Sequence, residues 1–174
     1  MTFETILKHA DIFLDLTLEQ IERIASICEE KYFGMGEIVF EEKSDSDELY
    51  IIARGQVEIL FNPAWVSDSS NTISRPTTIA TLQRGQSFGE MALVDQGLRS
   101  ATARSANNDT HLIIIPRPEL MQLCEDDPRL GYKLMYNMAA DLAYKIRNSG
   151  FIIREKLLYS SMDTSPISDD DPSK

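Results

Sequence analysis

Hydrophobic and polar positions follow two different periods along the chain. Residues 2–30 read as helical, and Ile21 and Ile24 begin an apolar face in the second part of this segment. Thr17, with Gln20 three residues later, has the pattern of a capping box, in which the two residues satisfy each other's free backbone amides. The pattern predicts helices that dock on a core formed by the residues that follow.

The two-residue period of β-strands comes next. Val57 and Ile59 alternate with polar residues, which is typical of a sheet with one face in water. The stretch 49–61 reads as two strands broken at Arg54-Gly55, and residues 62–76, which include Trp65, read as a long hairpin loop. Further strands are expected at residues 37–40, 77–82, 100–104 and 111–115. Short strands at this spacing are typical of β-sandwiches and β-rolls.

After Pro116 the pattern returns to helix. Asp127-Pro128 offers a cap followed by a proline for a long helix that is expected to reach Tyr159. Its apolar residues recur at nearly one helical turn, so one side can pack on the barrel and another on a second copy of the chain. Residues 160–174 are rich in serine, proline and aspartate and are expected to form a disordered acidic tail. The expected organisation is one domain, residues 1–159, and this tail.

Composition narrows the class of protein. The 174 residues suffice for one domain, and 43% hydrophobic with 26% charged residues is the profile of a soluble globular protein. Seventeen basic against 28 acidic residues give a net charge of −11, which repels nucleic acid. Neither a long apolar run nor a signal peptide is present, so we expect a cytoplasmic protein that does not insert into a membrane.

Cysteines and histidines are too few and too far apart for a zinc site. Cys28 and Cys124 lie in separate apolar segments, and His9 and His111 are the only histidines. The two cysteines are therefore expected to be reduced thiols in the core.

Candidate chemistry is concentrated in residues 85–102. A strand ends at glycines, a short helix begins near Glu90, and Arg99 follows among small residues. Free amides at a helix start attract an anion, and an arginine offers a planar fork of donors suited to phosphate. Glu90 can accept a hydrogen bond from a sugar hydroxyl on the same ligand. These features predict a sugar-phosphate pocket, and the small residues that allow close approach are Gly89, Ala92, Ser100 and Ala101.

Spacing alone also fits a simpler interpretation. A glutamate and an arginine nine residues apart more often form a salt bridge or two solvated charges. In an empty pocket, a buried carboxylate and guanidinium would tend to pair or to require water.

The sequence motif in this segment favours a ligand-binding site over a simple pair of charges. Phe88-Gly89-Glu90-Met91-Ala92-Leu93, followed by Arg99-Ser100-Ala101-Thr102, closely resembles the phosphate-binding cassette of the cyclic nucleotide-binding domain family. The resemblance covers about residues 5–158 and also includes Asp11-Ile12-Phe13 and the segments 36–40 and 50–57. It implies a mainly β fold with flanking helices: an eight-stranded antiparallel β-roll, or jelly roll, with an N-terminal helical bundle and a long C-terminal helix.

The resemblance also assigns roles. Glu90 would bond the ribose 2′-hydroxyl, Arg99 the cyclic phosphate, and backbone amides near Ala92 and Ser100 the phosphate oxygens. Gly89 would allow close approach to the ribose, and Met91 and Ala101 complete the predicted site. The family usually caps the base from the last helix, where the candidates are Tyr144, Lys145, Arg147 and Asn148.

Three departures from the family pattern are visible. Leu98 stands where proline often precedes the arginine, the turn at residues 42–45 lacks its usual glycine, and the loop 62–76 is longer than is common. The missing glycine suggests a hairpin of different shape. None of the departures removes a ligand contact.

The implied function is a cyclic nucleotide sensor that is not an enzyme. In relatives, alanine or serine after the arginine is common in cyclic AMP binders and threonine in cyclic GMP binders, so Ser100 favours cyclic AMP; its hydroxyl can also bond guanine, which leaves cyclic GMP open. Binding is expected to move the last helix over the pocket, with output through an unknown downstream protein or a homodimer. Only 15 residues follow Tyr159, too few for a helix-turn-helix domain.

Two alternatives stay open. A metal-dependent cupin enzyme shares the strand period but needs several barrel histidines, and only His111 is available. A cassette kept as a scaffold for protein interaction or dimerisation, without nucleotide, is the stronger alternative.

Overall fold

The computed structural model describes residues 2–62 and 76–162. The chain divides into two compact units, Met1–Met138 and Ala139–Lys174. Among the described residues, the first unit holds eight strands and the helices α1 to α4. The helix α5, Pro128–Met162, begins in the first unit and forms the described part of the second. The predicted loop residues 63–75, with Trp65, and the tail residues 163–174 lie outside the described residues.

The helical elements of the first unit are short. They are α1 (Phe3–Leu7), a 3₁₀ turn (Asp11–Phe13), α2 (Leu18–Ala25), α3 (Glu90–Asp95) and α4 (Arg117–Asp126). The capping box is confirmed, because Gln20 N donates to Thr17 Oγ1 at 3.2 Å and Thr17 N donates to Gln20 Oε1 at 3.1 Å. Asp127 caps α5 through bonds of 3.1 Å from the amides of Arg129 and Leu130.

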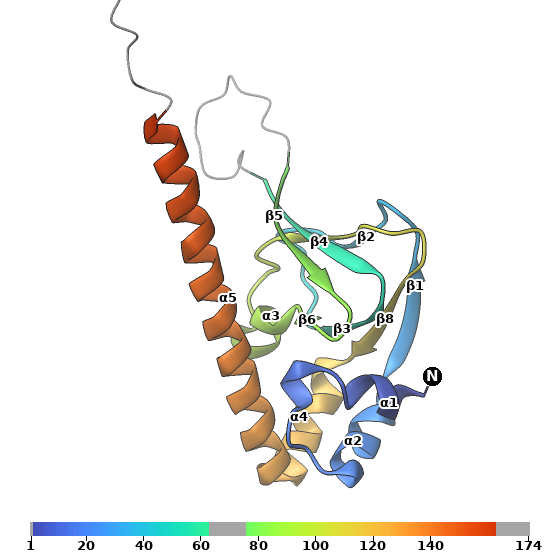
Figure 1. The fold of residues 1–174 in the computed structure, drawn as a ribbon. Helices are drawn as coiled ribbons and strands as arrows, with labels where there is room; N and C mark the ends of the chain where they lie inside the picture. Colours follow the sequence, from blue (N-terminus) through green and yellow to red (C-terminus); the bar gives the residue numbers. More distant parts are fainter. Residues whose placement is uncertain (1, 63–75, 163–174) are drawn as a thin grey trace, which may run out of the picture. The chain divides into compact units, whose positions relative to one another are not determined.

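Eight antiparallel strands form the β-roll in two four-stranded sheets (Figure 1). One sheet has the order β1-β8-β3-β6 and the other β2-β7-β4-β5. The strands are β1 (Glu29–Phe33), β2 (Ile38–Phe40), β3 (Leu49–Arg54), β4 (Gln56–Phe61), β5 (Thr77–Gln83), β6 (Ser87–Phe88), β7 (Thr102–Ser105) and β8 (Thr110–Ile115). The predicted fold class is confirmed.

The hydrophobic pattern missed two strands, the two-residue β6 and the longer β1. Helix was expected up to residue 30, but α2 ends at Ala25 and β1 begins at Glu29. Four of its five residues are exposed, so β1 carries almost no two-residue alternation of apolar side chains. Its pairing with β8, from Glu29 opposite Ile114 to Phe33 opposite Thr110, defines it as a strand.

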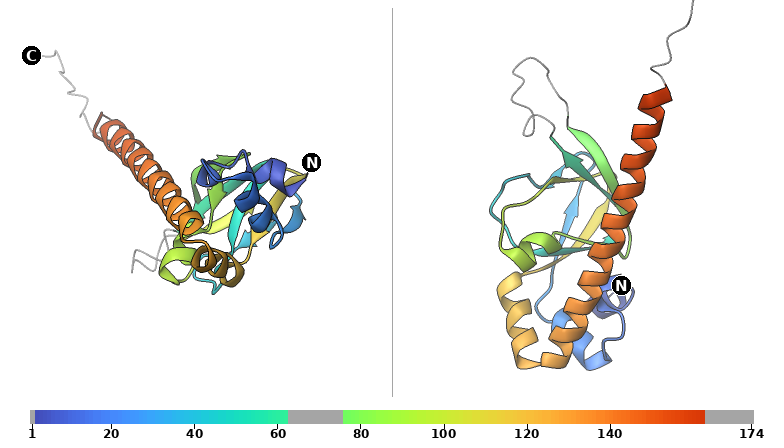
Figure 2. Two further views of the ribbon diagram at one scale, coloured as in Figure 1. Left: turned by 90° about the horizontal axis from the view of Figure 1, so that it is seen from below. Right: turned by 90° about the vertical axis from the view of Figure 1, so that its left-hand side faces the viewer.

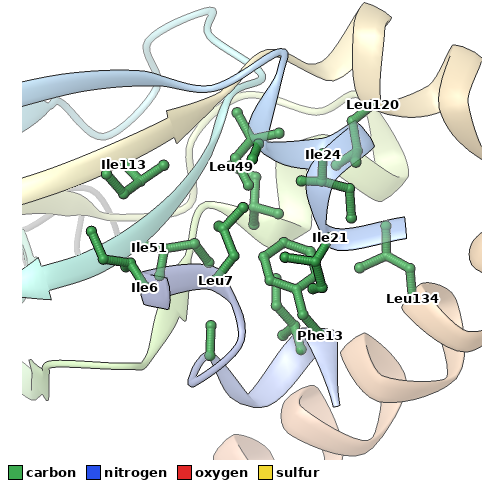
Figure 3. Packing of buried hydrophobic residues seen from close by; sticks show 14 of the residues in the cluster. Ile6, Leu7, Phe13, Ile21, Ile24, Leu49, Ile51, Ile113, Leu120 and Leu134 are labelled. Carbon is green, nitrogen blue, oxygen red and sulfur yellow. The ribbon is translucent and has the colours of Figure 1, made fainter. Parts of the chain in front are cut away.

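Strand β3 separates the two cores of the unit. Leu49, Ile51 and Ala53 belong to the cluster formed with the helices, whereas Tyr50 and Ile52 belong to the cluster inside the roll. Both faces of β3 are therefore covered, which explains its unbroken apolar run. The helices α1, α2 and α4 gather at one end of the roll, as the right-hand view of Figure 2 shows. Their buried hydrophobic side chains pack there against those of β3 and β8 (Figure 3).

Candidate ligand-binding site

The turn between β6 and α3 requires a glycine. Gly89 has φ +86°, a left-handed conformation that side chains other than glycine rarely adopt. A Cβ at this position would lie 2.6 Å from Arg99 Nη1 and 2.9 Å from the carbonyl oxygen of Glu48. The close approach of Gly89 to these two groups places the start of α3 beside the Arg99 side chain.

Arg99 is held at its backbone by the connection between β2 and β3. Its amide donates to Ser44 O at 3.1 Å, and its carbonyl accepts from Lys43 N at 2.8 Å. Lys43 has φ +67°, so this turn keeps a left-handed residue although it lacks the glycine. The lysine thus accepts a backbone conformation that glycine would adopt without strain.

The guanidinium of Arg99 points into the protein. The residue is 3% exposed, and its Nε donates to Ser46 Oγ at 2.8 Å. Nη1 donates to Gly89 O at 3.0 Å, and Nη2 donates to Glu48 O at 2.9 Å and to Glu48 Oε2 at 3.2 Å. Within the described residues these bonds use four of the five guanidinium N–H donors, and the fifth is on Nη1. A cation with such partners is oriented before any anion arrives.

Glu48 supplies the carboxylate that pairs with Arg99. Arg99 Nη2 lies 3.2 Å from Glu48 Oε2, so a carboxylate from outside the predicted cassette forms an ion pair with the guanidinium. Tyr50 also donates its hydroxyl to Glu48 Oε2 at 3.3 Å. Burial, and next the negative charge of Glu48, raise the pKa of Tyr50 to about 12, so this hydroxyl stays protonated and remains a donor.

The other predicted cassette residues surround this arrangement. Glu90 is the first residue of α3 and is 6% exposed, and Ala92 is 2% exposed. Met91 is half exposed, and its sulfur accepts a bond of 3.5 Å from the hydroxyl of the exposed Ser100. Ala101 is half-buried. The structure therefore brings a buried carboxylate and a buried guanidinium together at one glycine turn.

The base-cap candidates belong to the second unit. All four lie on α5, and Lys145 forms an ion pair of 2.6 Å with Asp141 one turn earlier. They stay a prediction. The candidates are Tyr144, Lys145, Arg147 and Asn148.

Three further observations concern metal ions, cysteines and membranes. No three histidine, cysteine, aspartate or glutamate side chains in residues 2–62 and 76–162 are grouped so that they could hold a metal ion. Both cysteines are free thiols that are partly buried against the core, and burial raises the pKa of Cys28 to about 12. Within the described helices, none is long and apolar enough to span a bilayer.

Comparison with known proteins decides the family. The model of the family described as "Cyclic nucleotide-binding domain" matches residues 30–127, more than half of the chain. The chain belongs to the cyclic nucleotide-binding domain family. The match includes β1 from its second residue, the whole of β2 to β8 and α4, together with the Gly89 turn and Arg99.

Relatives with established names include a receptor and a kinase. The domain is 28% identical over 143 residues to the Cyclic AMP receptor protein of Thermus thermophilus, covering 82% of this chain and 60% of the receptor. It is 27% identical over 120 residues to the human cGMP-dependent protein kinase 2, covering 69% of this chain and 15% of the kinase. The chain thus spans less than two thirds of the length of either relative.

Solved structures share the fold along most of the chain. A cyclic nucleotide-binding domain from Methylobacillus flagellatus has a TM-score of 0.74 at 26% identity and covers 88% of this chain and 83% of that one. A putative cyclic nucleotide-binding protein from Geobacter metallireducens has a TM-score of 0.67 at 29% identity and covers 84% of this chain and 99% of that one. The cyclic nucleotide-binding domain is a regulatory fold, and membership in this family argues against the alternative of a metal-dependent cupin enzyme.

Sequence reasoning missed the residues that orient Arg99 from outside the cassette. Ser46 and Glu48 precede β3, and Phe40 on β2 has its ring centroid 4.2 Å from Arg99 Cζ. Residues 44–48 are a short run of serine and acidic residues between two predicted strands, which resembles many surface turns. No local spacing distinguishes such a turn from one that folds against a cassette fifty residues later.

Proposed function

We propose that this domain binds a cyclic nucleotide, cyclic AMP in preference to cyclic GMP, at the turn formed by Gly89 and Arg99. The observation that carries the proposal is the buried guanidinium of Arg99, whose Nη1 donates to the carbonyl of Gly89 directly before the buried Glu90. In a chain with a net charge of −11, a buried and oriented cation is suited to an anionic ligand.

Each residue has a role in the proposed complex. The remaining Nη1 donor and the positive charge of Arg99 bind the cyclic phosphate, and Glu90 accepts a hydrogen bond from the ribose 2′-hydroxyl. Backbone amides near Ala92 and Ser100 donate to the phosphate oxygens. Gly89 and Ala101 are small enough for the ligand to approach the backbone, and Met91 lines the site.

Ligand preference and the response to ligand are parts of the same proposal. Ser100 favours cyclic AMP, and the T. thermophilus relative is named for that ligand, whereas the kinase relative is named for cyclic GMP. Binding moves α5 so that Tyr144, Lys145, Arg147 or Asn148 covers the base. The free energy available for this movement equals the difference in ligand affinity between the two helix positions.

Titration calorimetry with two substitutions tests the site. We expect Arg99→Ala and Glu90→Ala each to weaken cyclic AMP binding tenfold or more, because each removes a charge-assisted bond worth about 1.5–3 kcal/mol. Arg104→Ala is the matched control, since Arg104 on β7 pairs with Glu58 at 2.7 Å and contributes no group to the proposed site. Wild-type affinity in both site variants would overturn the assignment.

One observation favours a second candidate function. Four donors of Arg99 are already bonded within the protein, so the cassette is electrostatically satisfied without nucleotide. A scaffold for protein interaction or dimerisation would need no bound nucleotide to balance the charge of Arg99. A thermal shift with cyclic AMP against 5′-AMP separates the two functions, because a ligand at 100 times its Kd stabilises by about 2.7 kcal/mol and a scaffold gives no shift with either.

The remaining parts of the proposal concern the protein in the cell. Residues 1–159 form the binding domain and 160–174 an acidic tail. The domain acts in the cytoplasm, pairs with a second copy through α5, and passes its signal to another protein without contacting nucleic acid. Sedimentation of the full chain with and without cyclic AMP tests the pairing, and a monomer under both conditions would overturn it.

A further inference from the structure

The guanidinium of Arg99 has an aromatic neighbour that the proposed function does not use. Its Cζ lies 4.2 Å from the ring centroid of Phe40 and 5.5 Å from that of Tyr50. All five N–H donors of a guanidinium lie in its plane, so hydrogen bonds hold its edges and leave its faces without polar partners. The negative face of an aromatic ring attracts a cation within about 6 Å of its centroid.

Phe40 belongs to a cluster of three rings that is anchored in both sheets. Tyr50 and Phe88 stand opposite each other on β3 and β6, with centroids 5.0 Å apart and planes 15° apart. Phe40 comes from β2 in the other sheet and lies 5.5 Å from Tyr50 and 5.8 Å from Phe88. Because Tyr50 is 6% and Phe88 3% exposed, the ring of Phe40 rests on a buried support.

Different parts of the chain thus contact the edges and the face of the Arg99 guanidinium. Ser46, Glu48 and Gly89 bond three edges of the guanidinium, and Phe40 contacts its face. Apart from the Glu48 carboxylate, the hydrogen-bond partners of the guanidinium are neutral. Without the Phe40 ring, the long arginine side chain regains rotamers that turn its donors away from the ligand. Preorganisation of this kind raises affinity by lowering the entropy lost on binding.

We propose that Phe40 is a positioning residue for Arg99: its ring holds the guanidinium in the orientation that receives the ligand phosphate. The effect on affinity rests on the proposed cyclic nucleotide binding. The position of Arg99 in the ligand-free protein does not, so the two can be tested apart.

NMR of the arginine Nε–H group tests the positioning without ligand. In the wild type we expect a sharp, slowly exchanging Arg99 Nε–H signal with a nuclear Overhauser effect to the Phe40 ring. Phe40→Leu, which keeps an apolar side chain without the ring, should broaden or shift that signal, and Phe40→Tyr should restore it. Phe33→Leu is the matched control, because it removes from the same internal cluster a ring that faces Lys31, whereas Arg99 faces Phe40 and Tyr50.

Calorimetry then tests the consequence for the ligand. Loss of a cation–π contact of about 1–2 kcal/mol corresponds to about a five- to thirtyfold weaker affinity for cyclic AMP in Phe40→Leu, with little change in Phe40→Tyr or Phe33→Leu. An Arg99 signal that is the same in Phe40→Leu and wild type would overturn the proposal, as would a changed signal with unchanged affinity.

Two further outcomes remain informative. If Phe40→Leu does not fold, the Overhauser effect in the wild type decides, and its absence overturns the positioning. If the wild type binds no cyclic nucleotide, the proposed function fails, whereas a changed Arg99 signal in Phe40→Leu still supports the positioning of the guanidinium by the ring.

Discussion

At the scale of single residues, Gly89 is the position where backbone conformation and site geometry coincide. Its left-handed φ excludes most side chains, and its missing Cβ leaves the space that Arg99 Nη1 and the Glu48 carbonyl occupy. Gly89→Ala must therefore displace both the chain and the guanidinium. We expect the free energy of unfolding to fall by about 2 kcal/mol or more, and binding of cyclic AMP to be lost.

Gly36→Ala is the control for this substitution. Gly36 also has a positive φ, +81°, but an added Cβ would meet no atom within 4 Å. Gly36→Ala should lower the free energy of unfolding only by the strain of a left-handed alanine, about 1–2 kcal/mol, and should leave cyclic AMP binding unchanged. Denaturant unfolding and calorimetry of both variants make the comparison, and equal effects on binding would contradict the role of Gly89.

At the scale of elements, the hairpin between β3 and β4 depends on Gly55. Its φ is +88°, and an added Cβ would lie 2.7 Å from Thr110 Oγ1 and 2.9 Å from Thr110 Cα. Thr110 is fully buried and bonds Ser105 Oγ at 2.7 Å, so it has little room to move. We expect Gly55→Ala to lower the free energy of unfolding by at least 1 kcal/mol more than Gly36→Ala. An equal loss in the two variants would show that the hairpin relaxes without cost.

The start of α5 has a pH-dependent cap. A hydrogen bond from Gln20, then the amide of Leu130, lower the pKa of Asp127 below its usual 3.8. Since the folded pKa is depressed, the stabilisation is present above the unfolded value and is lost as the pH falls through the folded one.

Asp127→Asn tests this dependence, because asparagine also caps helices but carries no charge. As the pH falls from about 6 to about 3, the wild type should lose stability relative to the variant. Urea unfolding at each pH measures the difference. Parallel profiles for the two proteins would contradict the role of the ionised cap.

At the scale of the whole molecule, the response of α5 to ligand decides whether the domain is a sensor or a passive binder. We expect cyclic AMP at saturation to slow amide exchange across residues 128–158, in addition to the cassette, because the helix is drawn toward the ligand. 5′-AMP is the ligand control. Protection confined to residues 85–102 would leave binding intact and contradict the helix movement.

Local sequence was sufficient to predict most of the elements. The Thr17 capping box, the break at Gly55 and the start of α5 at Asp127 depend on residues within a few positions of each other, and all are present. Strand β1 could not be predicted in this way, because its exposed residues show no period and its pairing with β8 joins segments eighty residues apart.

The same distinction applies to the site. Gly89, Glu90 and Arg99 lie in one continuous segment, so the sequence by itself determined the family, the fold and the groups proposed to bind a phosphate and a sugar hydroxyl. Only the tertiary structure decided how Arg99 is held. Phe40 reaches it because β2 pairs with β7, the strand that follows Arg99, and Glu48 reaches it from the turn before β3 in the other sheet. Contacts between such distant segments leave no trace in local spacing.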